Sequence, residues 1–290
     1  MSKKNKIALI AILVLGVLFL AAAYLRSHNV QVLNPKGLIA LKERGLMITV
    51  TLLMLIVVIP VFVMTFFIAW KYRESNTKAK YSPELDHNSV AEFTWWAIPC
   101  VLILVIGIIT WQSSHELDPY KSLVSSAQPI TIQVVALPWK WLFIYPEQNI
   151  ATVNFVEFPQ NTPVGFEVTS DAPMNSFWIP QLGGQIYAMA GMRTNLHLMA
   201  SGTGSYNGSS ANLSGKGFAG MKFIAKSVSS GDFNQWLATV ATTGGRLGLE
   251  QYTQLAKPSE NNQVTYYSSE ENGLYDWIIS KYMMPGSSTQ

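Results

Sequence analysis

Few residues in the second half of the chain are of types that perform chemistry. From residue 113 onward there are two histidines, His115 and His197, and no cysteine. Zinc and copper centres need several Cys or His ligands that converge, and the sequence contains neither an HExxH nor a CxxC pattern. His197 stands between Leu196 and Leu198 in an alternating segment, which predicts that it points to the polar face of a strand. We therefore expect no metal site in this chain.

Sequence patterns for other kinds of catalysis are also missing. No Ser/His/Asp grouping is visible, although a triad assembled only by folding would leave no such pattern. No glycine-rich phosphate loop follows an expected strand, because Gly202-Thr203-Gly204 alone is too weak a signal. The sequence predicts that this chain carries no catalytic residue.

Glu92 is an acidic residue three positions before Trp95, where a long apolar segment begins. A carboxylate near a helix N-terminus is favoured by the helix dipole, which is a sufficient structural explanation. Acidic residues at membrane depth also mark ion paths. Glu92 is therefore a candidate for proton uptake as well as a simple interfacial carboxylate.

Composition and charge place these residues in a membrane-associated chain. Of the 290 residues, 49% are hydrophobic and 13% are charged, which is too apolar for an ordinary soluble protein. Residues 1–112 contain 11 Lys and Arg against 5 Asp and Glu, whereas residues 113–290 contain 9 against 12. The basic excess lies beside the apolar segments and indicates membrane orientation rather than nucleic-acid binding. The single cysteine, Cys100, lies inside an apolar run and is interpreted as a small packing residue.

Three apolar segments organise the first part of the chain. Residues 1–25 have a lysine-rich start and small residues at 21–23, which predicts a signal peptide or an uncleaved anchor. Residues 26–112 are expected to form a hairpin of two transmembrane helices, at 46–70 and 95–113. The loop at 71–94 contains Lys71, Arg73, Lys78 and Lys80, which by the positive-inside rule places it in the cytoplasm and residues 113–290 outside the membrane.

Short alternating segments dominate the part that follows. They include 130–136, 164–169, 195–200 and 221–225, separated by turns rich in Gly, Pro and Asn. This pattern predicts a β-sandwich or barrel domain over residues 113–230. Residues 231–290 are expected to form a C-terminal arm with helices at 232–239 and 273–283, a glycine-bearing loop at 242–248 and a disordered tail at 285–290.

An aromatic cluster opens the expected domain, with four aromatic residues between Trp139 and Tyr145. It includes Trp141. The structural interpretation is a corner of the sandwich core. The functional interpretation is a contact with a redox partner.

The architecture and several motifs together resemble subunit II of the haem-copper respiratory oxidases, and in particular its quinol-oxidising, cytochrome bo-type branch. The resemblance covers residues 33–285, and its motifs are LNPKG (33–37), LMLIVVIP (53–60), AWKYR (69–73), AKYSPELDH (79–87), WKWLFIYPEQ (139–148), MNSFWIPQLGGQIYAMAGM (174–192), SGKGFAGMKF (214–223) and LAKPSENNQVTYYS (255–268). It implies a cupredoxin-like Greek-key sandwich after the membrane hairpin.

Relatives that oxidise cytochrome c hold a dinuclear copper centre in that domain. The resemblance aligns the copper-ligand positions of those relatives with six residues of this chain, called here the ligand-equivalent residues: Asn175, Ser210, Asn212, Ser214, Phe218 and Met221. Only the methionine is retained. Because serine hydroxyls do not replace bridging thiolates, we expect no copper in this chain and no electron transfer from cytochrome c.

The resemblance also implies roles for three other residues. Glu92 matches a glutamate at the mouth of the K proton channel. Trp139 matches a tryptophan that accepts electrons from copper, and here Trp139 and Trp141 are expected to pack against subunit I. The chain lacks the lipobox cysteine found in many quinol-oxidase subunits.

The expected function is that of a non-catalytic subunit of a proton-pumping ubiquinol oxidase in the cell inner membrane, with the C-terminal domain in the periplasm. The haems and one copper would belong to subunit I, and subunits III and IV and membrane lipid would be further partners. One alternative is a copper-containing cytochrome c oxidase subunit. The other is a membrane-anchored periplasmic binding module with no redox role.

Overall fold

The computed structural model describes residues 16–17, 19–20, 23–24, 30–79 and 87–283. The predicted leader or anchor at 1–25 lies largely outside the described residues, and the predicted tail at 285–290 lies wholly outside them. The chain forms two compact units. One comprises residues 42–121, and the other comprises the residues up to 41 together with those from 122 onward.

The first unit is the expected helical hairpin, built from α2 (Leu38–Lys71) and α3 (Ser89–Glu116). Among the described residues, these two helices are long and apolar enough to cross a membrane. Each contains its predicted span and extends beyond it at both ends. α3 begins early because Asn88 caps it, with its side-chain oxygen accepting from the Ala91 N–H at 3.0 Å.

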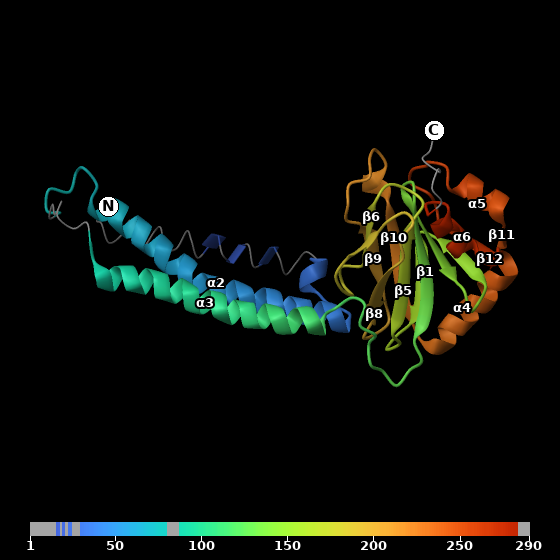
Figure 1. Cartoon of the computed structure of the whole chain (residues 1–290), viewed down its shortest axis with the longest axis horizontal. Helices are drawn as coiled ribbons and strands as arrows, with labels where there is room; N and C mark the ends of the chain where they lie inside the picture. The colour runs from blue at the N-terminus through green and yellow to red at the C-terminus, as the bar shows by residue number, and fades with distance from the viewer. Residues whose placement is uncertain (1–15, 18, 21–22, 25–29, 80–86, 284–290) are drawn as a thin grey trace. The chain divides into compact units, whose positions relative to one another are not determined.

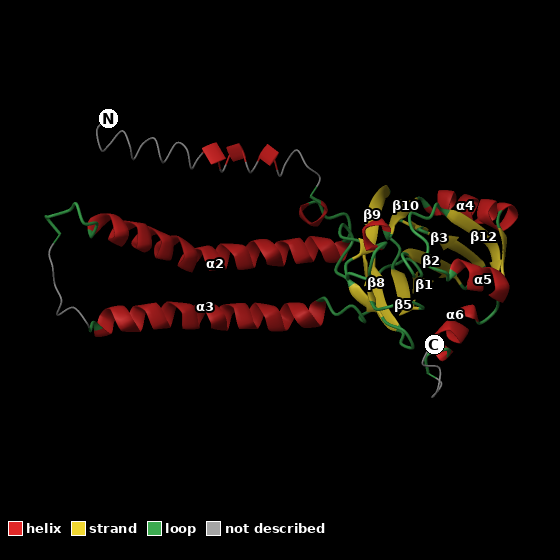
Figure 2. Ribbon diagram, turned by 90° about the horizontal axis from the view of Figure 1, so that it is seen from above, coloured by secondary structure: helices red, strands yellow, loops and turns green. Residues whose placement is uncertain are grey.

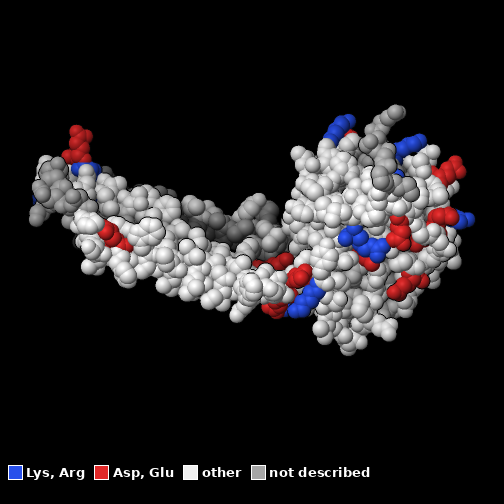
Figure 3. Space-filling view, in the orientation of Figure 1, with Lys and Arg blue, Asp and Glu red and all other residues white. Residues whose placement is uncertain are grey.

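Large apolar side chains cover the outside of this hairpin. Phe62, Phe66 and Ile103 are 58%, 68% and 68% exposed in the isolated chain. Figure 3 shows that the face of the hairpin turned to the viewer carries charged residues only toward its ends. Such a surface needs lipid or another apolar protein surface around it.

The second unit is a sandwich of two sheets, drawn in Figures 1 and 2. In the described residues, one sheet has the strand order β11 (Gly245–Leu247), β12 (Thr265–Glu270), β3 (Ile150–Val153), β2 (Lys140–Tyr145), β1 (Ile130–Leu137), β5 (Val164–Ser170), β8 (Thr194–Leu198). The other has the order β4 (Phe155–Pro159), β10 (Lys222–Val228), β9 (Gly204–Ser210), β6 (Asn175–Trp178), β7 (Ile186–Ala188). β1 pairs in parallel with β5, and β10 with β4, among otherwise mostly antiparallel pairs. The predicted fold class, a membrane hairpin followed by a cupredoxin-like sandwich, is confirmed.

β2 explains why residues 141–145 form one continuous apolar run in the sequence. Its residues are all buried, and they alternate between two separate cores. Trp141, Phe143 and Tyr145 face the second sheet, whereas Leu142 and Ile144 face the C-terminal helices. A strand buried on both faces loses the polar alternation of a half-exposed strand.

The four predicted strands are present, and the predicted helices appear as α4 (Ser230–Thr243) and α6 (Leu274–Ser280). His197 is half-buried between two buried leucines, as the alternation predicted. Two short 3₁₀ helices, Gln31–Leu33 and Phe218–Gly220, and α5 (Leu249–Leu255) were not foreseen.

The C-terminal segment is not simply a helical arm. The expected loop at 242–248 contains β11, and β12 joins the larger sheet beside β3. α4, α5 and α6 lie on the side of the sandwich that carries these two strands (Figures 1 and 2). The segment is therefore part of the sandwich, because its strands complete the sheet edge that β3 would otherwise leave unpaired.

Candidate functional site

Three of the ligand-equivalent residues meet where β6 begins and β9 ends. Asn175 and Ser210 are 1% and 5% exposed, and the Ser210 hydroxyl lies 3.1 Å from Asn175 Oδ1. The same hydroxyl lies 3.2 Å from the backbone carbonyl of Asn212. Pairing of β6 with β9 fixes this proximity, since Phe177 stands opposite Ser210. We call these three residues the neutral cluster.

The amide groups of the neutral cluster are turned toward nearby backbone. Asn175 Nδ2 donates to the Pro173 carbonyl at 2.6 Å, and Asn212 Nδ2 donates to the Met174 carbonyl at 2.8 Å. Their donors are thus engaged within the protein. Buried polar groups are stable in this arrangement because each finds a partner.

The other ligand-equivalent residues are held differently. Met221 is 1% exposed, and its carbonyl accepts from the Ser210 N–H at 3.2 Å. Ser214 and Phe218 lie on the next loop, and the Ser214 carbonyl accepts from Trp139 Nε1 at 3.0 Å. The Ser214 hydroxyl is buried without a hydrogen-bond partner among the described residues. Among the described residues, Ser210 and Asn175 are the two of these six whose side chains are joined by a hydrogen bond.

The chemistry of this end does not fit a dicopper centre. Its side chains supply neutral amide and hydroxyl groups, one thioether and one phenyl ring, where such a centre uses thiolates and imidazoles. Among the described residues, no three His, Cys, Asp or Glu side chains group in a way that could hold a metal ion.

The two tryptophans of the predicted subunit-contact cluster have different surroundings. Trp141 is 0% exposed and packs edge-on against Phe177 at a centroid distance of 5.4 Å. Trp141 therefore packs inside the sandwich core, because β2 turns it inward, and its contact with another subunit stays a prediction. Trp139 is half-buried at the turn before β2, with a positive φ of 62°. It remains a candidate contact.

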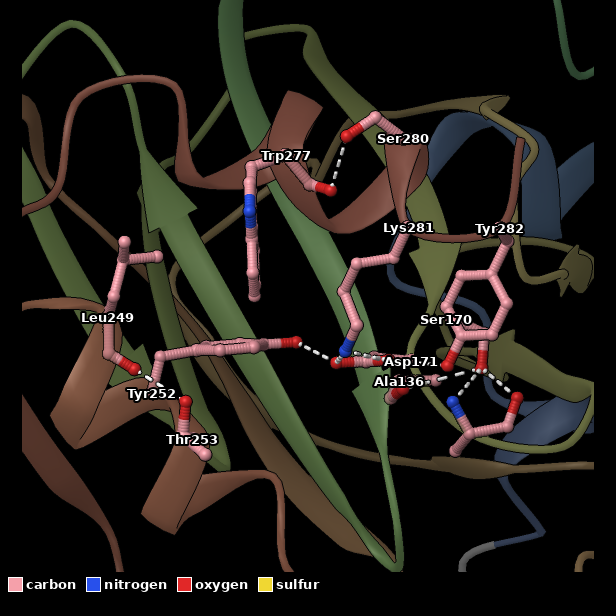
Figure 4. A network of polar contacts seen from close by, with 11 residues as sticks. Ala136, Ser170, Asp171, Leu249, Tyr252, Thr253, Trp277, Ser280, Lys281 and Tyr282 are labelled. Atoms are coloured by element: carbon pink, nitrogen blue, oxygen red, sulfur yellow. Dashed lines mark hydrogen bonds and ion pairs between the residues drawn. The ribbon is translucent and has the colours of Figure 1, made fainter. Parts of the chain in front are cut away.

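A second polar cluster lies just before the neutral cluster in the sequence, at Asp171 (Figure 4). The Asp171 side chain is 3% exposed, and its carboxylate accepts from the Lys281 ammonium at 2.7 and 2.8 Å. The hydroxyls of Tyr252 and Tyr282 donate to the same carboxylate, the first at 2.5 Å. We call these four residues the Asp171 cluster.

The phenols of this cluster are held as donors. Burial raises the pKa of the Tyr252 hydroxyl, and the negative charge of Asp171 raises it further. Burial and Asp171 act in the same direction on the pKa of Tyr282. Both hydroxyls therefore stay protonated at neutral pH and can hydrogen-bond the carboxylate.

The Asp171 cluster joins distant parts of the chain. Asp171 follows β5, Tyr252 belongs to α5, and Lys281 and Tyr282 follow α6. The cluster thereby attaches the C-terminal segment beside the loop at 172–174 that leads into Asn175. Sequence analysis missed it because its members are far apart and individually ordinary. The only local signal was the aromatic content of residues 252–282.

Lys140 makes a second attachment to the C-terminal segment. It is 1% exposed, and its ammonium donates to the carbonyls of Leu255 and Lys257, each at 2.8 Å. These carbonyls belong to the C-terminal end of α5 and the residues just after it, where a cation is favoured. Burial lowers the pKa of Lys140.

Glu92 lies in the first turn of α3, which begins six residues before the predicted span. Its Oε1 accepts from the Asn88 N–H at 3.3 Å and lies 2.7 Å from His87 Nδ1. The Glu92 side chain is 33% exposed. It is thus close to a titratable group and reachable from solvent.

Comparison with known proteins gives consistent relatives. Residues 242–286 match the COX Aromatic Rich Motif family. The chain is 54% identical over 261 residues to cytochrome bo(3) ubiquinol oxidase subunit 2 of Pseudomonas aeruginosa, an alignment that covers 90% of this chain and 79% of the relative. It is 51% identical to the protein of the same name from Pseudomonas putida, covering 97% and 88%, and 49% identical to ubiquinol oxidase subunit 2 of Acetobacter aceti, covering 90% and 86%.

Among solved structures, the periplasmic domain of subunit II of cytochrome oxidase from Bradyrhizobium japonicum matches with a TM-score of 0.37 and 24% identity. The match covers 38% of this chain and 91% of that domain.

Proposed function

Because the chain belongs to the ubiquinol oxidase subunit 2 family, we propose that it is a structural subunit of a proton-pumping ubiquinol oxidase and holds no dinuclear copper centre. The observation that carries the second part is the neutral cluster. The groups at the ligand-equivalent positions of Asn175, Ser210 and Asn212 are neutral and hydrogen-bonded to one another or to nearby backbone.

Without a copper centre, this subunit has no group that could take an electron from cytochrome c. Electrons would enter the complex from ubiquinol, and the haems and one copper that reduce oxygen would belong to subunit I. The hairpin would lie in the inner membrane against subunit I, and the sandwich would cap the complex on the periplasmic side. Trp139, half-buried and fixed by Ser214, is the candidate contact of the sandwich.

The test uses the complex purified in mild detergent through a tag on this chain. Metal content, the haem spectrum and oxygen uptake are measured with ubiquinol and with reduced cytochrome c. We expect haem, a single copper and uptake from ubiquinol alone. Three coppers with uptake from cytochrome c would contradict the absence of a copper centre, and a preparation without haem would contradict the oxidase role.

We also propose that Glu92 lies at the entry of a proton channel into the complex. Its carboxylate is partly exposed and lies 2.7 Å from His87 Nδ1. Carboxylates at the membrane surface are suited to collecting protons for an internal path.

The prediction for Glu92 is that Glu92→Gln slows ubiquinol-driven oxygen uptake, because the amide cannot release a proton. The slowing should grow as pH rises, since protons then become scarce at the surface. Glu74→Gln is the matched control, because Glu74 is an exposed carboxylate of the 71–94 loop. Equal turnover of the two variants between pH 6 and 9 would remove Glu92 from the proposed path.

A further inference from the structure

The chain just before α2 is fixed to the sandwich. The N–H groups of Lys36 and Gly37 donate to the Gln181 carbonyl at 2.7 and 3.1 Å, and the Ser201 N–H donates to the Lys36 carbonyl at 2.8 Å. The approach is close enough to require glycine at 37, because an added Cβ would lie 2.7 Å from the Leu182 oxygen. The Lys36 backbone is thus held on both sides.

The first turn of α2 is attached in the same way. The Leu38 N–H donates to the Met199 carbonyl at 3.3 Å, and the Ala40 N–H donates to the Leu182 carbonyl at 3.1 Å. These amide groups would otherwise lack partners at a helix start. The start of α2 is therefore a rigid extension of the sandwich up to Leu41.

A cavity of about 350 Å³ opens beside this turn. The residues that line it include Lys36, the hydroxyl residues Ser201 and Thr203, and the apolar or aromatic residues Leu41 and Tyr206. Tyr206 donates its own hydroxyl to the Gly202 carbonyl at 3.0 Å. Within the described part of the chain, no carboxylate forms an ion pair with Lys36, so its charge is available to a ligand. The cavity thus combines one cation and hydroxyl donors with an apolar wall.

The position of Leu41 along α2 indicates how far this cavity lies from the hydrocarbon core of the membrane. The uncharged run of α2 begins at Leu46, a little more than one helical turn later, or about 7 Å at the rise of an α-helix. The headgroup layer extends roughly 5–8 Å beyond the hydrocarbon core on each side of a bilayer. A helix that enters the hydrocarbon at Leu46 therefore holds Leu41 at the level of the lipid headgroups.

We propose that this cavity binds the phosphodiester headgroup of a membrane phospholipid. The Lys36 ammonium pairs with the phosphate, the hydroxyls of Ser201 and Thr203 donate to its oxygens, and an acyl chain follows Leu41 into the membrane. The inference rests on the proposed membrane role of α2. A free phosphate could accept the same ion pair and hydrogen bonds, but it has no apolar part that could pack against the apolar lining of the cavity.

The test measures phospholipid on the intact purified complex by native mass spectrometry after a mild detergent wash. Lys36→Gln removes the cation, and Gly202→Phe fills the rim of the cavity, where an added Cβ meets no atom within 4 Å. Lys216→Gln is the matched control, because Lys216 is 85% exposed and pairs with Glu260 on another loop. We expect the wild type and the control to retain one phospholipid that both cavity variants bind about tenfold more weakly.

A second measurement separates a lipid from a free anion. Dihexanoyl phosphatidylglycerol or inorganic phosphate is added to the washed complex, and the thermal midpoint of the sandwich is followed. The short-chain lipid should raise the midpoint in the wild type and in Lys216→Gln only. Equal protection by inorganic phosphate, or equal lipid retention by all variants, would overturn the proposal. An unchanged haem spectrum and ubiquinol-driven uptake in the same samples keep this result separate from the proposed oxidase function.

Discussion

The Asp171 cluster and the neutral cluster lie on either side of the three-residue loop at 172–174. The first contains a buried charge with its partners, whereas the second contains only uncharged groups. Asp171 is a buried carboxylate that accepts from one ammonium and two phenols. Asn175 and Ser210 are buried too, but the hydrogen bond between their side chains involves no charged group. One end of the loop is held by an ion pair to the C-terminal segment, and the other is closed by neutral local contacts.

The two clusters differ in how strongly they depend on the positions of their partners. A buried carboxylate is costly unless its partners remain in place, so the Asp171 cluster demands a specific position of α5 and α6. Neutral hydrogen bonds contribute less and can be rearranged more easily. Of the two clusters, the neutral cluster therefore constrains the position of its surroundings less.

The largest expected effect is that of Asp171→Asn. The amide removes the buried negative charge that the Lys281 ammonium and the two phenols contact, and we expect the free energy of unfolding of the sandwich to fall by about 3 kcal/mol. Denaturant unfolding of the detergent-solubilised complex, followed by tryptophan fluorescence, measures this loss. Asp276→Asn is the control, because Asp276 is 74% exposed in its pair with Arg193 and should cost under about 1 kcal/mol. Similar losses in the two variants would show that the Asp171 cluster is no stronger than a surface pair.

The next effect concerns the loop that covers Trp139. An added Cβ at Gly217 would lie 2.4 Å from Trp139 Cδ2, so Gly217→Ala must displace either the ring or the loop. We expect a loss of about 1–3 kcal/mol and faster amide exchange at 214–218. Hydrogen exchange with mass spectrometry measures it, and Gly202→Ala, with free space at its Cβ, should leave exchange unchanged. Unaltered exchange in Gly217→Ala would mean that the loop is not closed over Trp139.

A smaller effect is expected within the neutral cluster. Ser210→Ala removes the hydroxyl that lies beside Asn175 Oδ1, and the expected loss is about 1 kcal/mol. The shift of the denaturant midpoint measures it against Ser209→Ala, which changes the half-buried neighbour on the same strand. A loss as large as that of Asp171→Asn would refute the contrast between the two clusters.

Glu270 sharpens the comparison because it is a half-buried carboxylate, one oxygen of which is buried without the partners that Asp171 has. Its Oε2 is buried with no hydrogen-bond partner among the described residues, and burial raises its pKa from the ordinary value of 4.5 to about 7. Between these two pH values the native state binds the proton more tightly than the unfolded chain does. The contribution of Glu270 to stability therefore falls as pH rises from 4.5 to 7.

The smallest expected effect follows from this sign. Glu270→Gln should raise the free energy of unfolding at pH 8 by at most about 1 kcal/mol, since the side chain is partly exposed, and should change it little at pH 5. Denaturant midpoints at the two pH values measure this difference. Glu250→Gln, on the exposed first turn of α5, is the control. An increase of equal size at both pH values would contradict the assignment to Glu270.

The features that could be predicted from sequence were those with a local pattern. Uncharged apolar runs gave both membrane-length helices, and alternation gave the strands that begin at Ile130 and Val164. The starts of α2 and α3 were placed too far inward, because the charged residues at 42–44 and Glu92 interrupt the apolar runs on which the search relied. Two interpretations of the aromatic cluster stayed open, because a run of aromatics does not reveal which side of a strand each residue, such as Trp141, faces.

The sequence alone determined which chemical groups the chain contains. A region from 113 onward without cysteine cannot supply bridging thiolates, whatever its fold, and an uncharged run of membrane length is apolar in any conformation. Only the tertiary structure decided which distant residues meet. Asp171 with Lys281, Lys140 with the end of α5, and Lys36 with Ser201 are contacts between segments far apart in the chain, set by strand pairing and helix packing rather than by any local spacing.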